Sequence, residues 1–262
     1  MQDLSFASWC RQRQEELAGA DSWLGMAGLF WLEAGVHGVG GLHTDAVFIA
    51  GAPHVGRLEV SAGQKVRWLP AMGDAIELVS DKVGKPSTVD FENHSFFIVE
   101  REGRLAMRLR NPRWRETIAF TGLRYFDEDP AWIVEADWLA LPEPLAMEVP
   151  NVLGELKPVV VTQQAVFFIG KQRVCLLPMS VSEREVFFVF RDRTCGQESY
   201  GAGRFLKADA AVDGKIRLDF NRAYNPPCAF TAFATCPLPP PENWLPFAVQ
   251  AGEKKPEYRR ID

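Results

Sequence analysis

Residues 131–138 read AWIVEADW, and their side chains alternate with the two-residue period of a β-strand. The even-numbered residues from Trp132 to Trp138 are all apolar and would share one face, whereas Glu135 and Asp137 would lie on the other. A strand of this kind is typical of an antiparallel sheet that buries one face and exposes the other. This stretch therefore predicts β structure in the middle of the chain.

Similar strand-like segments, punctuated by Gly, Pro, Asn and Asp, occur on both sides of this stretch. They cover residues 46–50, 57–60, 65–69, 75–79, 95–100, 104–109 and 116–120 before it, and 158–162, 165–169, 172–177 and 186–190 after it. A spacing of roughly 8–12 residues is typical of an antiparallel sandwich or barrel. The predicted fold class is therefore mostly β, with antiparallel sandwich or barrel sub-structures.

Two features suggest how the strands are organised. Residues 3–18 have the helical spacing of apolar residues separated by polar ones, so we expect a short N-terminal helix. Residues 141–150 read LPEPLAMEVP, a proline-rich connection that either joins two sub-domains or bridges sheets within one fold. We expect an N-terminal helix and β sub-domain over 1–140 and a C-terminal β sub-domain over 141–262, or else one continuous domain.

Composition excludes several classes of protein. The 262 residues include 29 Lys and Arg against 34 Asp and Glu, and this net charge of −5 gives no support for nucleic-acid binding. No apolar run approaches the roughly 20 residues of a membrane span. The five cysteines lack CxxC spacing, which disfavours a disulfide scaffold or a zinc ribbon. We expect a cytoplasmic protein without a membrane or nucleic-acid partner, and homo-oligomerisation is compatible with this composition.

Histidine is scarce, and its distribution limits the chemistry. The four histidines all lie at or before His94, so the C-terminal part of the chain has no imidazole. This disfavours a Ser-His or Cys-His hydrolase and a His-rich metal centre confined to that part. No metal ligand is predicted, and no motif identifies a cofactor. Carboxylate, guanidinium, tyrosine and amide chemistry remains.

The last third of the chain carries a family resemblance. It reads FRDRTCGQESYGAGRFL at 190–206 and contains DFNRAYNPPCAF at 219–230, followed by ATCPLPPPEN. These segments closely resemble the DUF1684 family, a bacterial family of uncharacterised proteins. Three further segments resemble other signatures of the family, namely GLFWLEAG at 28–35, SDKVGKP at 80–86 and VPNVLG at 149–154. The resemblance implies no reaction, because the family is defined without one. Trp244 stands where the family usually has Arg, and Cys195 where it usually has Ser or a similar residue.

The segment KIRLDF at 215–220 offers the clearest candidate for acid–base chemistry. Its alternation places Ile216, Leu218 and Phe220 on one face and Asp219 on the other. Asp219 is either a catalytic acid or base, or the partner of Arg191 or Arg204 in an ion pair.

Three hydrogen-bonding side chains follow this strand, in a turn that two prolines stiffen. They are Asn221, Tyr224 and Asn225. Either they bind a substrate, or the two asparagines bond backbone groups and shape the loop.

The segment RDRTCGQESYGAGR at 191–204 is predicted to be a tight hairpin, because glycine permits a positive φ. Arg191 and Arg204 could hold a carboxylate or phosphate through bidentate hydrogen bonds, and Thr194 and Tyr200 could complete its shell. The alternative is that the arginines form ion pairs with nearby acidic residues, namely Asp192, Asp219 or Glu253.

Glu253 is the second candidate acid or base, and a buried pair with Lys254 is the alternative. Cys228 and Cys236 also match the family pattern, but their spacing does not indicate a metal site. Together these residues predict a polar pocket in the C-terminal third that binds or transforms a small anionic molecule by carboxylate and arginine chemistry. The alternative is a non-catalytic ligand-binding or protein-interaction module in which the polar cluster is structural.

Overall fold

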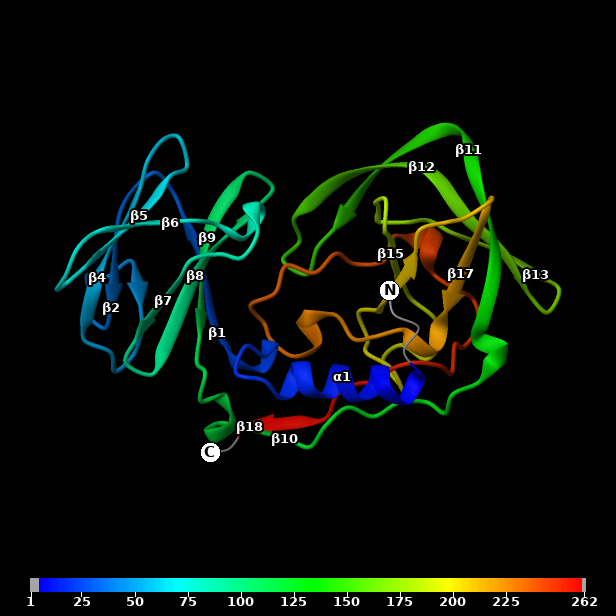
Figure 1. The fold of residues 1–262 in the computed structure, drawn as a ribbon, viewed down its shortest axis with the longest axis horizontal. Helices are drawn as coiled ribbons and strands as arrows, with labels where there is room; N and C mark the ends of the chain where they lie inside the picture. The colour runs from blue at the N-terminus through cyan, green and yellow to red at the C-terminus, as the bar shows by residue number, and fades with distance from the viewer. Residues whose placement is uncertain (1–4, 261–262) are drawn as a thin grey trace. The chain divides into compact units, whose positions relative to one another are not determined.

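The computed structural model describes residues 5–260, which form mostly antiparallel β structure with an N-terminal α-helix, α1 (Phe6–Ala18) (Figure 1). The predicted fold class is confirmed. Contacts divide the chain into unit 1, which combines residues up to Gly19 with those from Ile118 onward, and unit 2, Ala20–Thr117. The chain thus divides before Ile118, whereas the predicted boundary near residue 140 falls inside a strand of unit 1.

Unit 2 is a sandwich of two sheets around one core. One sheet has the order β3-β2-β4-β5-β6 and the other β1-β9-β8-β7. The strands are β1 (Met26–Leu32), β2 (Gly35–Gly40), β3 (Val47–Phe48), β4 (His54–Val60), β5 (Val66–Pro70), β6 (Ile76–Leu78), β7 (Thr88–Phe91), β8 (His94–Arg101) and β9 (Arg104–Arg110). Val39 and Leu58 from the first sheet pack with Phe96 and Met107 from the second, and none of these four side chains is exposed.

Unit 1 contains α1, short 3-10 helices and three sheets, with orders β13-β12-β11-β17, β14-β15-β16 and β10-β18. The strands are β10 (Ile118–Phe120), β11 (Ile133–Pro150), β12 (Leu156–Ile169), β13 (Gln172–Leu176), β14 (Ser180–Val181), β15 (Glu185–Phe190), β16 (Arg204–Asp209), β17 (Lys215–Asp219) and β18 (Tyr258–Arg260). Ile216, Leu218 and Phe220 lie in the core with Phe188 and Leu206, which confirms the alternation predicted for KIRLDF.

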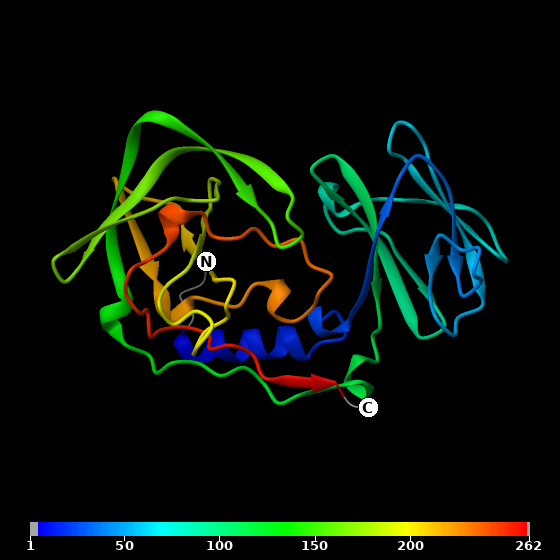
Figure 2. The same cartoon turned by 180° about the vertical axis from the view of Figure 1, so that it is seen from behind.

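The predicted proline-rich connection at 141–150 is wrong, because these residues continue strand β11. Pairing with β12 is interrupted between Ala140 and Leu145, and Pro142 and Pro144 lie in that interruption. A proline is tolerated at such a bulge because no ladder hydrogen bond is required of its nitrogen. The two predicted strands at 158–162 and 165–169 likewise form the single strand β12, and Figures 1 and 2 show the long β11–β12 ribbon.

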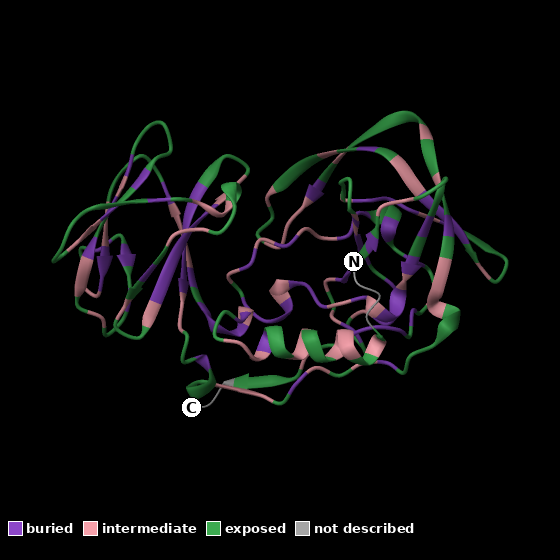
Figure 3. Cartoon of the chain, viewed as in Figure 1, coloured by how far each residue is buried: buried purple, intermediate pink, exposed green. Residues whose placement is uncertain are grey.

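Helix α1 begins where Ser5 caps it, since the Ser5 hydroxyl accepts a hydrogen bond from the Ser8 amide at 3.3 Å. The helix confirms the predicted one, whose first residues, 3 and 4, lie outside the described residues. Both views show it beside β10 and β18, and Figure 3 shows it only partly covered. No helix among the described residues is long and apolar enough to span a membrane.

Candidate functional site

The segment 191–203 is a long loop that joins β15 to β16 in an antiparallel hairpin. A hairpin was predicted here, but the loop that connects its two strands is longer than the tight turn expected. Its last turn depends on Gly203, whose φ is +100°. A Cβ atom there would lie 2.7 Å from the Phe190 carbonyl oxygen, so no larger residue fits this conformation.

Arg204 is fully buried in an ion pair with Asp192 at the base of this loop. The distance from Arg204 Nη2 to Asp192 Oδ2 is 2.6 Å, and both side chains are 0% exposed. The guanidinium also donates to the carbonyl oxygens of Val249 and Ala251. Arg204 therefore fits the ion-pair alternative, and its charge is used inside the protein rather than offered to a ligand.

Asp192 and Thr194 hold the loop in its shape. Asp192 Oδ1 accepts a hydrogen bond from the Thr194 amide at 2.7 Å and one from the Val249 amide at 3.2 Å. The buried Thr194 hydroxyl lies 2.7 Å from the Ser199 hydroxyl. Thr194 was predicted to bind an anion, but its hydroxyl already has this partner.

The segment 239–246 lies against the start of the loop because Asn243 anchors it. The Asn243 side chain is 0% exposed, accepts from the Leu177 amide at 2.8 Å and donates to the carbonyl oxygens of Leu177 and Val189. Backbone bonds on both sides of Arg191, to Asn243 and Leu245, then align Arg191 with Trp244. The Asn of the proline-rich segment thus determines where Arg191 lies.

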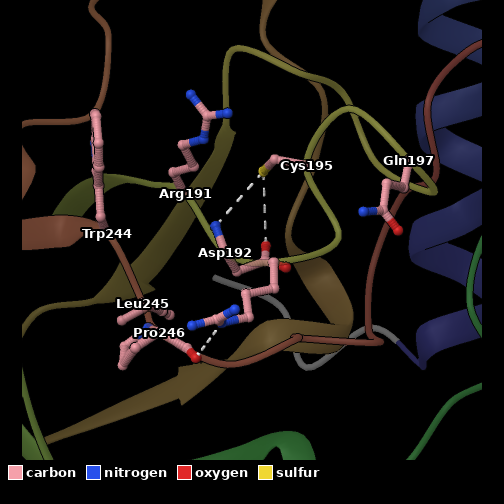
Figure 4. A pocket seen from close by; sticks show the side chains of 8 residues that line it. Arg191, Asp192, Cys195, Gln197, Trp244, Leu245 and Pro246 are labelled. Carbon is pink, nitrogen blue, oxygen red and sulfur yellow. Dashed lines mark hydrogen bonds between the residues drawn. The ribbon is translucent and has the colours of Figure 1, made fainter.

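Arg191 and Trp244 form one side of a cavity of about 610 Å³. The cavity is also lined by Arg193, Cys195 and Gln197. The Arg191 guanidinium lies 5.4 Å from the Trp244 ring centroid, a cation–π arrangement. Figure 4 shows the Arg191 side chain beside this ring and the Cys195 sulfur directed toward Asp192. Among the described residues, no carboxylate forms an ion pair with Arg191 or Arg193.

Asp219 and Asn221 connect β17 to the loop before β11. The Asn221 amide group is buried and bonds both the amide and the carbonyl oxygen of Asp129, at 3.0 and 2.9 Å. Asp219 accepts from the Asn221 amide at 3.2 Å and forms an ion pair with Arg222 at 3.2 Å. Asn221 fits the loop-shaping alternative, and the ion-pair partner of Asp219 is Arg222 instead of Arg191 or Arg204.

Replacing Asp219 with alanine is expected to lower the free energy of unfolding by about 1 kcal/mol, because the N-cap of the 3-10 helix that begins at Phe220 is lost. Asp219→Asn is expected to lower it less, because the amide oxygen still accepts the Asn221 N–H. Urea unfolding of both variants measures the difference. Equal losses would mean that the charge, and not the cap, is what stabilises the protein.

Glu253 lies in a second buried cluster, beneath helix α1. It is 0% exposed, and its carboxylate accepts from Arg13 Nε at 2.9 Å and from the Asn225 amide at 2.8 Å. Burial raises the pKa of the Glu253 carboxyl above its usual value, although Arg13 opposes this. The same cluster raises the pKa of Cys10 to about 11, through burial and the nearby Glu253. The partner of Glu253 is therefore Arg13, and not the predicted Lys254.

The tyrosines and the paired cysteines are also engaged. The Tyr200 hydroxyl donates to the Cys228 carbonyl oxygen at 2.9 Å, and burial raises the pKa of Tyr200. Tyr224 packs between Arg13 and Phe205, at centroid distances of 4.9 and 5.7 Å. Cys228 donates its amide to the Cys236 sulfur at 3.2 Å, and neither cysteine forms a disulfide among the described residues.

A comparison with known families identifies the chain. The profile described as "Protein of unknown function (DUF1684)" matches residues 118–254. The chain belongs to the DUF1684 family. It is also similar to an uncharacterized protein of Haloarcula marismortui solved by solution NMR, with 35% identity, a TM-score of 0.44, and coverage of 55% of this chain and 80% of that one. No curated protein matches the chain.

The predicted site residues of this DUF1684 protein therefore do not converge on one site. Arg191 lines the cavity, Arg204 and Thr194 form the buried base of the loop, and Glu253 with Asn225 lies beneath α1. The predicted catalytic residues Asp219 and Glu253 do not line the cavity. Sequence reasoning missed Arg193, Gln197 and Trp244 as lining residues. The first two lie in the quoted segment 190–206, and Trp244 directly follows ATCPLPPPEN.

Proposed function

We propose that this DUF1684 protein binds a small anionic molecule in the cavity beside Arg191 and Trp244. The observation that carries the proposal is the charge of the lining. Arg191 and Arg193 face the cavity without an ion-pair partner among the described residues, whereas the carboxylate of Asp192 is neutralised by Arg204. Two guanidinium groups at one cavity favour a carboxylate or a phosphate, which they bind through paired N–H donors.

The aromatic wall suggests the rest of the ligand. Trp244 is 54% exposed, and its indole nitrogen is fixed by a 3.0 Å bond to the Pro239 carbonyl oxygen. A large exposed ring held in one orientation supports stacking of a planar group. A planar molecule with one anionic substituent therefore suits the cavity, whose volume lies within the roughly 300–1,000 Å³ of small-molecule sites.

The proposed role is binding, because neither of the two carboxylates predicted as acid or base lines the cavity. Glu253 is fully buried in its pair with Arg13, and Asp219 caps a helix outside the cavity. Cys195 is the nucleophilic side chain in the lining of the cavity. Its sulfur accepts hydrogen bonds from the Asp192 amide at 3.5 Å and from the Ser199 hydroxyl at 3.6 Å.

Arg191→Gln is expected to weaken binding of a planar anion at least tenfold, about 1.4 kcal/mol. Benzoate and adenosine monophosphate are suitable probes, one with a carboxylate and one with a phosphate. Titration calorimetry on the full chain measures the affinity, and Arg184→Gln is the matched control because Arg184 is exposed outside the cavity. Equal affinities in the two variants, or no binding of either probe to the unaltered protein, would count against this site.

A further inference from the structure

A second cavity of about 570 Å³ lies in unit 2, on the face of the β1-β9-β8-β7 sheet that points away from the sandwich core. On β9 the core residues are Leu105, Met107 and Leu109, so Arg108 and Arg110 project from the other face. Both arginines line the cavity. Arg108 is only 3% exposed, and arginine side chains are seldom buried to this extent.

The strand register places the lining residues in two rows across the sheet. Arg110 pairs with Ser95 and Ser95 with Asp90, while Arg108 pairs with Phe97 and Phe97 with Thr88. Directly paired residues present their side chains on the same face. The floor of the cavity therefore changes from guanidinium groups on β9, through a hydroxyl and a ring on β8, to Asp90 and Thr88 on β7.

Aromatic and apolar side chains complete the walls. Trp23, Met26, Pro86 and Pro112 line the same cavity. The Arg108 guanidinium lies 5.0 Å from the Trp23 ring centroid, and that of Arg110 lies 5.0 Å from the Phe97 centroid. Stacked arginines keep their N–H edges directed away from the ring, and such edges can receive an oxyanion.

The Ser95 hydroxyl is the group that points to a ligand in this cavity. It is only 6% exposed, lines the cavity, and its hydroxyl has no hydrogen-bond partner among the described residues. The neighbouring Arg110 Nε is buried and also without a hydrogen bond, while its Nη1 binds Asp21, a carboxylate that is 88% exposed. A buried polar group without a partner is destabilising, and an incoming acceptor would supply that partner.

We propose that this cavity binds a small monocarboxylic acid with an apolar body. The carboxylate would accept hydrogen bonds from Arg110 and Ser95, displacing the exposed Asp21, and the apolar body would lie against Trp23 and Phe97. A single charge is favoured over a phosphate dianion because the three carboxylates of the lining offset all but one of its four cations. The carboxylates are Asp21, Asp81 and Asp90, and the cations are Lys85, Arg101, Arg108 and Arg110. The Arg101 guanidinium already donates two hydrogen bonds to Asp81, of 2.9 and 2.7 Å, so its charge is not offered to the ligand.

The test is a titration of the full chain with phenylacetate, octanoate, phenyl phosphate and the neutral phenylacetamide. The readout is the change in the amide NMR shifts of β8 and β9. At concentrations on the order of 10 mM, millimolar dissociation constants are measurable. Saturable shifts at Ser95, Phe97 and Arg110 with a monocarboxylate are expected. The absence of such shifts with both monocarboxylates, equal binding of phenylacetamide, or tighter binding of phenyl phosphate would overturn the proposal.

Two variants connect the shifts to these side chains. Arg110→Gln is expected to weaken binding at least tenfold and Ser95→Ala about threefold, whereas Arg57→Gln, an exposed cation outside the cavity, leaves it unchanged. Arg191→Gln in unit 1 is also expected to leave it unchanged, which separates this site from the anion site proposed above. Unaltered affinity in folded Arg110→Gln protein would show that the acid binds elsewhere.

Discussion

Arg204→Met is expected to lower the free energy of unfolding by about 3–5 kcal/mol, because removing one partner of a buried ion pair leaves the other charge uncompensated. Asp192 would keep its bonds from the amides of Thr194 and Val249 but lose the guanidinium that neutralises it. The carbonyl oxygens of Val249 and Ala251 would also lose a donor. Urea unfolding followed by tryptophan fluorescence measures the loss.

Lys207→Met is the matched control for this prediction. Lys207 lies on the same strand, β16, and pairs with Glu185 at 3.0 Å, but the two side chains are 46% and 37% exposed. An exposed pair of this kind contributes about 0–1 kcal/mol. If Arg204→Met cost no more than Lys207→Met, the Arg204–Asp192 pair would not be what holds the loop in place.

Arg13→Met is expected to destabilise the protein by about 3–5 kcal/mol at neutral pH, because Glu253 would remain buried without its cation. The loss should depend on pH in a defined direction. Burial raises the pKa of Glu253 in the folded protein above its usual value of 4.5. A carboxyl with a raised folded-state pKa contributes stability that is present below its unfolded pKa and is lost as the pH rises through the folded one. Without Arg13 the pKa rises further, so the loss grows and extends to higher pH.

Unfolding free energies between pH 4 and pH 8 provide the check. Arg13→Met is expected to steepen the decline with rising pH, and Glu253→Gln to flatten it, because an amide does not titrate. Glu242→Gln, a change at an exposed carboxyl in the 3-10 helix Pro241–Asn243, serves as the control. An unchanged slope in Glu253→Gln would mean that Glu253 titrates alike in the folded and unfolded states.

Local pattern predicted the elements of this protein better than their boundaries. Alternation found β17 and the first part of β11, because one face of each strand is buried and the period is visible in a few residues. It failed at 141–150, where proline indicates a break in an isolated segment. In the folded chain, β12 pairs with the residues after the interruption and continues the strand.

The candidate site was predicted as a list of residues and not as a set of neighbours. The family segment does hold the polar residues, yet Arg191 and Arg204, both expected to clamp one anion, differ completely in exposure. Asp192 turns inward and takes Arg204, which leaves Arg193 as the second cation at the cavity. A hairpin loop of irregular backbone has no period, so the sequence cannot say which side chains point inward.

The amino-acid sequence by itself determined the β class, the N-terminal helix and the family, because strand period, helix period and a long motif are all local properties. Only the tertiary structure decided which charges are partners. Arg13 and Glu253 lie near opposite ends of the chain and meet because α1 packs against the last segment. Ion pairs between distant residues depend on chain topology, and a buried charge stays in the fold only where such a partner is brought to it.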